Sequence, residues 1–190
     1  MTVAIPSLNN ISQNFPITSS EYNILEKKFG QLAYYAAWQL SRKNTNNNHY
    51  FDIEDFQQEF MIAVIRAGSY YKRQNYIQKS FAKIDRHATT PFEKLMLKQL
   101  KDLWGLRTRH GASRQKFGPK QEEILDGLVR ITVPKGEQPT MSDPLVLDTK
   151  FIIYAKRILW NSSNNVGRKI TKIKHISANQ VSLNDFDYFV

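Results

Sequence analysis

Basic side chains are concentrated in two blocks of this sequence, and the chemistry that they offer is phosphate binding. Residues 66–120 contain 14 basic and 3 acidic residues, and residues 150–174 contain seven basic residues and no acid. The whole chain of 190 residues has 27 basic and 17 acidic residues, a formal net charge of +10. A field of this sign favours polyanions, because each neutralised phosphate releases counterions. The composition therefore predicts contact with nucleic acid, with a solvated basic surface as the alternative.

Catalytic and metal-binding patterns are weak in the same sequence. Four histidines are scattered without the spacing of metal ligands: His49, His87, His110 and His175. The absence of cysteine excludes disulfides, thiolate zinc sites and cysteine nucleophiles. The segment 85–87, Asp-Arg-His, is too short a pattern to indicate a nuclease, and no phosphate-cradling glycine loop occurs. We therefore expect no enzyme activity, no metal and no cofactor.

The elements that must position the basic blocks are expected to be helices. Along several segments the apolar residues recur at intervals of three and four, which is the spacing of one buried helix face. No segment shows the sustained alternation of a strand, so the predicted fold class is all-α. Residues that favour a helix start predict where the helices begin: Ser19 or Ser20, Asp52, Pro91, Lys120 and Asp148.

Polar and glycine-containing segments predict where these helices end. The first helix should end at the polar loop 44–49, and the second near Gly68. The last helix should be interrupted at 161–167, before a second basic stretch. Residues 105–119 are basic and loop-like, and prolines make 132–144 a linker.

The start of the second expected helix carries the most specific pattern. It reads DIEDFQQE from Asp52 to Glu59, with a capping residue, an acidic first turn and a Gln-Glu pair. Taken alone, this pattern favours a well-capped amphipathic helix over a docking surface. The segment also resembles the polymerase-docking helix of the sigma factor family, which reads Asp-Leu-x-Gln-Glu before small and aliphatic residues and an aromatic. The resemblance implies that Asp55, Gln58 and Glu59 face bacterial core RNA polymerase.

The segment that begins at Lys150 resembles the promoter-melting helix of the same family. That helix carries Phe-x-x-Tyr-Ala followed by tryptophans and basic residues, and this chain has Phe151, Tyr154 and Trp160 in the corresponding order. Aromatic rings can stack on unpaired bases while neighbouring cations hold the backbone. The resemblance implies promoter DNA as a partner of these aromatic and basic residues: Tyr154, Lys156, Arg157, Trp160, Arg168 and Lys169. We expect Phe151 to belong to the core and Trp160 to be the best candidate for a base contact.

The segment 74–147 departs from the family pattern. In sigma factors the docking and melting helices are nearly adjacent, so this segment would be a basic helical insertion. Its Arg107, Arg109 and Arg114 could track duplex phosphates without reading sequence, with a solvated loop as the alternative. Another register starts the melting helix at 76–81 and leaves 151–170 unassigned. The sequence also lacks the second helix-turn-helix with which full-length sigma factors read the upstream promoter element.

The C-terminal residues 181–190 combine aromatic, aliphatic and acidic side chains. Short peptides of this type can anchor in a hydrophobic pocket, with the acids setting orientation. The tail is similar to the end of the late-transcription sigma factors of large tailed phages, which bind the DNA sliding clamp. The similarity implies a clamp contact through Leu183, Phe186, Tyr188 and Phe189. The alternative is that the tail folds back on its own core.

Together these patterns predict a reduced, phage-type sigma factor of the host cytoplasm, without a membrane span or a secretory signal. The resemblance divides the chain into five parts: a flexible arm 1–20, polymerase-docking helices 21–73, a basic insertion and linker 74–147, a DNA-binding helix 148–176 and a partner-binding tail 177–190. Its helical core would be compact, with flexible tails. The second interpretation is a DNA-binding regulator or architectural protein that never contacts polymerase. A nuclease is the third.

Overall fold

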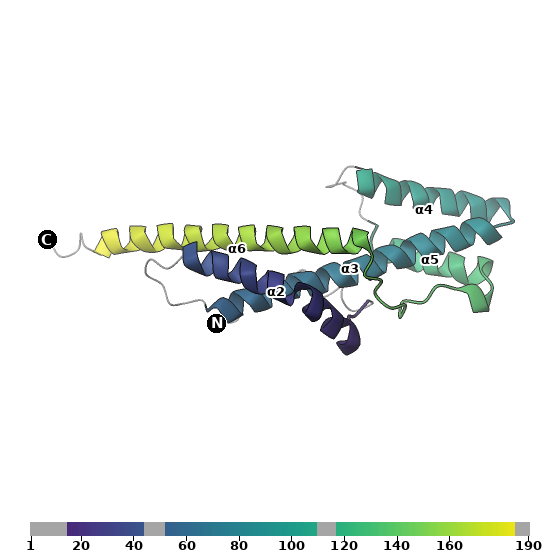
Figure 1. Cartoon of the computed structure of the whole chain (residues 1–190). Coiled ribbons are helices and arrows are strands. Elements are labelled where there is room, and N and C mark those ends of the chain that lie inside the picture. The colour runs from purple at the N-terminus through teal and green to yellow at the C-terminus, as the bar shows by residue number, and fades with distance from the viewer. Residues whose placement is uncertain (1–14, 44–51, 110–116, 185–190) are drawn as a thin grey trace. The chain divides into compact units, whose positions relative to one another are not determined.

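The computed structural model describes residues 15–43, 52–109 and 117–184 (Figure 1). These residues form helices and connecting segments without a strand, which confirms the all-α prediction. The elements in chain order are α2 (Ser19–Lys43), α3 (Ile53–His87), α4 (Pro91–Arg109), α5 (Pro119–Thr132), the short 3-10 helix η1 (Lys135–Glu137) and α6 (Thr149–Asn184). None of the described helices combines the length and the apolar character that crossing a membrane requires.

The chain divides into two compact units. The first unit comprises residues 1–70 and 145–190, and the second comprises residues 71–144. The long helix α3 contributes its first half to the first unit and its second half to the second. The second unit therefore covers nearly the same residues as the segment 74–147 that departs from the sigma factor pattern.

The first unit is built on α2, the first half of α3 and α6. Figure 1 shows α2 lying along α6, and the two helices pack against each other. Apolar residues three and four positions apart place one face of each helix in the core. The fully buried side chains include Leu25 and Phe29 of α2, Phe60 and Val64 of α3, and Phe151 and Leu159 of α6.

The carboxylate of Glu21 fastens two connecting segments to the first unit. Its Oε2 accepts hydrogen bonds from the backbone N–H of Thr18 at 2.8 Å and from the Thr18 hydroxyl at 3.1 Å. Its Oε1 accepts the backbone N–H of Leu145 at 2.7 Å. Because Glu21 is only 7% exposed, these bonds replace the water that a carboxylate would otherwise need. The helix start and the entry to α6 are thus tied together.

Helix α3 does not end near Gly68, as the sequence suggested, but runs to His87. A glycine inside a helix costs about 1 kcal/mol relative to alanine, and packing outweighs that cost. A Cβ at Gly68 would lie 3.0 Å from Cδ1 of Ile17, so the small residue allows this close approach. Beyond it, Ile77, Phe81 and Ile84 continue the helical spacing and are buried in the second unit. No helix begins at 76–81, the start that the alternative register required.

Helix α6 is also longer than predicted, because it continues without interruption through 161–167. Asparagine, serine and glycine are weak helix formers, but each costs only part of a kcal/mol, up to about 1 for glycine. The packing of Leu159 and Ile170, both buried on either side of this stretch, outweighs that cost. At Gly167 the helix comes so close to α2 that a Cβ would lie 3.2 Å from Cδ1 of Leu40.

The second unit has an aromatic and aliphatic core of its own. The rings of Phe81, Trp104 and Phe117 meet edge to face, with centroids 5.7 to 6.2 Å apart. Helices α4 and α5 pack against each other and bury Leu97, Leu100, Leu125, Leu128 and Val129. Helix α4 extends through Gly105 to Arg109, which the sequence had placed in a loop.

Buried polar side chains hold the second unit together. Arg73 is 5% exposed, pairs with the carboxylate of Glu122, and donates from Nη2 to the carbonyl of Phe117 at 2.8 Å. The hydroxyl of Tyr76 donates to Oδ1 of Asp126 at 2.5 Å. Burial, reinforced by that carboxylate, raises the pKa of Tyr76 well above its ordinary value. The Arg73–Glu122 ion pair and the Tyr76–Asp126 hydrogen bond fix α3 to α5.

The proline-containing segment 132–144 is part of the second unit rather than a free linker. Nζ of Lys83 lies 2.9 Å from Oε2 of Glu137, and Nζ of Lys79 lies 2.5 Å from Oδ2 of Asp143. The hydrogen bond from Lys83, with one from His87, holds the pKa of Glu137 below its usual value. Both ion pairs are partly exposed, so they fix the path of the segment more than they stabilise the fold.

Candidate nucleic-acid interface

Helix α6 presents a buried face to the core and an exposed basic face. Phe151, Ala155, Leu159 and Ile170 are spaced by multiples of the helical turn and are all buried. Apart from Tyr154, the DNA-binding candidates of this helix all have exposed side chains: Lys156, Arg157, Trp160, Arg168 and Lys169. The residues that the sequence assigned to promoter DNA thus lie largely on one helix, outside its core face.

The aromatic residues of α6 divide between core and surface. Phe151 is 0% exposed, and its ring meets that of Phe29 edge to face with centroids 6.1 Å apart, so its prediction as a core residue is confirmed. Tyr154 is half-buried, with its ring 6.0 Å from that of Tyr70 in α3. Trp160 is 50% exposed. Of the three rings, that of Trp160 offers the most surface to a base.

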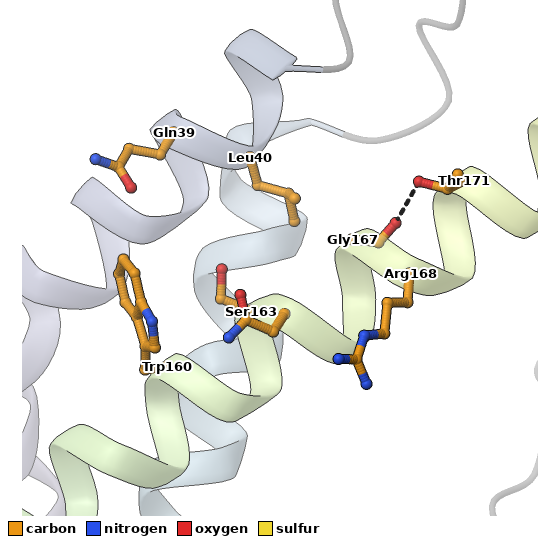
Figure 2. Close-up of a pocket in the computed structure, with 8 residues that line it drawn as sticks. Gln39, Leu40, Trp160, Ser163, Gly167, Arg168 and Thr171 are labelled. Carbon is orange, nitrogen blue, oxygen red and sulfur yellow. Dashed lines mark hydrogen bonds between the residues drawn. The ribbon is translucent and has the colours of Figure 1, made fainter.

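A pocket opens beside Trp160, between α2 and α6 (Figure 2). Figure 2 shows the indole ring extending from α6 toward Gln39 of α2, with Arg168 further along α6, eight residues after Trp160. The pocket is lined by Gln39, Leu40, Trp160, Ser163, Asn164, Gly167, Arg168 and Thr171. The hydroxyl of Thr171 donates to the carbonyl of Gly167 at 3.0 Å, so it stays bound to its own helix.

The pocket combines the chemical groups that an unpaired nucleotide needs. The indole of Trp160 offers a face for stacking, and the amides of Gln39 and Asn164 offer donors and acceptors for a base edge. The guanidinium of Arg168 can pair with a phosphate. Sequence reasoning found Trp160 and Arg168 but not the contribution of α2, because helix spacing alone does not show which two helices face each other.

The charged residue that lines this pocket is basic, Arg168. Helix α6 contains seven basic residues and no acidic residue between Thr149 and Asn184. Helix α2 has no acidic residue after Glu26, whereas its last two residues are Arg42 and Lys43. Neither of the two helices that form the pocket has an acidic residue near it, and both carry basic residues. Their positive charge favours an anionic ligand.

The three residues predicted to face polymerase lie at the start of α3. Asp55 and Gln58 are exposed, and Glu59 is partly exposed. Asp55 also has a structural contact, because its Oδ2 accepts the backbone N–H of Asp52 at 3.4 Å, in the manner of a capping box. Gln58 and Glu59 have no such contact with the helix start among the described residues, so they are the better probes of an external partner.

The remaining predicted site residues lie elsewhere. Arg107 and Arg109 belong to α4 in the second unit, where the structure describes the backbone and not these side chains. Leu183 belongs to the end of α6, again without a described side chain. Arg114 and the tail residues Phe186, Tyr188 and Phe189 lie outside the described residues. The structure therefore places the α6 candidates and the α3 candidates in one unit, and Arg107 and Arg109 in the other.

Within the described ranges, no group of three histidine, aspartate or glutamate side chains is arranged to hold a metal ion. The chain matches no protein-family model, no curated protein and no solved structure. Its function must therefore be inferred from its own residues and from the resemblance of its two short motifs.

Proposed function

We propose that this chain is a reduced, phage-type sigma factor that binds bacterial core RNA polymerase and directs it to late promoters. The observation that carries the proposal is the pocket beside Trp160, which joins a half-exposed indole to Arg168 on a helix without acids. Unpaired promoter bases are the ligand that such a combination suits. The same unit carries the exposed Gln58 of the motif that resembles the polymerase-docking helix.

In this proposal two parts of the first unit, the start of α3 and the exposed face of α6, bind different partners. The start of α3, through Gln58 and Glu59, contacts polymerase. The exposed face of α6 contacts the melted promoter, with Trp160 on a base and the neighbouring cations on the backbone. The protein would work in the cytoplasm of a bacterial host, where the polymerase is found.

A second candidate function is DNA binding without polymerase, as a regulator or an architectural protein. It is favoured by the absence of acidic residues from α6 and by the basic block of the second unit. Neither feature requires the chain to be a sigma factor, because contacts with phosphates bind DNA of any base sequence.

We expect Gln58→Ala/Glu59→Ala to lose most of its binding to bacterial core polymerase in a pull-down. Both side chains are at least partly exposed, so their removal should leave the fold intact and remove polar contacts at the partner surface. If each contributes about 1 kcal/mol or more at the interface, the double variant should bind at least tenfold more weakly.

The matched control is Gln99→Ala/Glu123→Ala, which removes the same two side-chain types from exposed positions of the second unit, outside the segment 21–73 that the resemblance assigns to polymerase docking. This control should bind like the wild type. Retention of DNA by a wild-type chain that captures no polymerase from several hosts would favour the second function instead.

The tail is tested separately. We expect Phe186→Ala/Tyr188→Ala to spare polymerase binding while reducing transcription stimulated by a sliding clamp, because aromatic anchors dominate small peptide interfaces. The measurement is run-off transcription from a late promoter, with and without the loaded clamp. Equal clamp stimulation of the variant and the wild type would remove the tail from the proposal.

A further inference from the structure

Helix α2 carries exposed aromatic side chains that the proposed function leaves unused. Tyr35 is 50% exposed and Trp38 is 37% exposed. Their rings are stacked, with centroids 6.0 Å apart and planes 26° from parallel. Cζ of Arg42 lies 4.7 Å from the centroid of the Trp38 ring. We call Tyr35, Trp38 and Arg42 the α2 aromatic row.

The α2 aromatic row adjoins the pocket beside Trp160. Gln39 is the link, because its Nε2 donates to the hydroxyl of Tyr35 at 2.8 Å while the same residue lines the pocket. Figure 2 shows Gln39 and the Trp160 indole on facing helices at one end of this pocket. A strand that places one base in the pocket can therefore place a neighbouring base against the row.

The charges around the row indicate what kind of partner it fits. Arg42 is part of the row, Arg168 lines the pocket, and no acid follows Glu26 on α2 or occurs on α6. An acidic peptide could pair with these cations, but it offers planar rings only where it carries aromatic residues, as residues 181–190 of this chain do. A nucleic acid strand supplies both groups in alternation, a planar base and an anionic phosphate.

We propose that the α2 aromatic row and the adjoining pocket form a site for single-stranded DNA, which the chain binds without polymerase. Bases stack on Tyr35 and Trp38, and Arg42 pairs with the backbone. An exposed cation–π contact is weaker than the stacking of a base on the same ring. An incoming base can therefore displace the guanidinium from Trp38, and the guanidinium then reaches a phosphate. The site goes beyond the proposed function, because it requires no partner protein.

The test uses the full chain and a fluorescein-labelled oligothymidylate, followed by fluorescence anisotropy. We expect Tyr35→Ala/Trp38→Ala to weaken binding by roughly tenfold or more, since alanine substitution removes the stacking of at least one base. Tyr35→Phe/Trp38→Phe keeps an aromatic ring at each position, so it should retain much of the stacking and bind more tightly than the alanine variant. Arg42→Gln should flatten the salt dependence of the affinity, because one phosphate contact is lost.

The control is Phe92→Ala/Leu95→Ala on α4, where the two side chains are 62% and 55% exposed. It removes a similar apolar surface from the other unit and should leave the affinity unchanged. Three results would overturn the site: wild-type affinity of the α2 alanine variant, an equal loss in the α4 control, or equal binding of duplex and single-stranded DNA. The assay contains no polymerase, so failure of the sigma proposal and failure of this site are observed separately.

Discussion

Phe151→Ala should lower the free energy of unfolding by about 3–5 kcal/mol, the usual cost of removing a fully buried aromatic ring. Phe151 is 0% exposed, and its ring lies edge to face against Phe29 of α2. The substitution leaves a cavity between α2 and α6, the two helices that form the pocket beside Trp160. Urea denaturation followed by far-UV circular dichroism measures the change.

Trp160→Ala is the matched comparison, because it removes a larger ring from the same helix. Its side chain is 50% exposed, so the unfolding free energy should change by only about 0.5 kcal/mol. The two variants thus separate a core residue from a proposed base-contacting residue within one aromatic motif. A large loss of stability for Trp160→Ala, or a loss below about 1 kcal/mol for Phe151→Ala, would contradict this division.

Arg73→Met should destabilise the second unit by roughly 3 kcal/mol, because it leaves the Glu122 carboxylate without its partner in a poorly solvated site. The two side chains are 7% and 16% exposed. The carbonyl of Phe117 also loses the Nη2 donor that lies 2.8 Å from it. Fluorescence of Trp104 reports on this unit alone when Trp38 and Trp160 are replaced by phenylalanine.

The double variant Arg73→Met/Glu122→Leu tests the physical reason. Replacing both members of a buried ion pair by apolar side chains removes the unpaired charge, so most of the lost stability should return. If the double variant has a lower free energy of unfolding than Arg73→Met, the unpaired carboxylate of Glu122 is not the cause of the lost stability.

Sequence patterns predicted where helices begin more reliably than where they end. Asp148 was expected to cap α6, and its Oδ1 accepts the backbone N–H of Phe151, three residues further on, at 2.7 Å. A cap is a local interaction between neighbouring residues, so its signal is contained in a short segment. The ends predicted at Gly68 and at 161–167 were wrong, because tertiary contacts outweigh the small cost of weak helix formers.

The sequence likewise predicted some features of the candidate site and not others. The sequence by itself determined the all-helical class, the core position of Phe151 and the basic character of α6, since each follows from residue type and helical spacing. Only the tertiary structure decided that Gln39 of α2 faces Trp160, and that Tyr154 packs on Tyr70. The physical reason is that the pairing of helices far apart in the chain depends on the shapes of both surfaces, such as the close approach of Leu40 at Gly167.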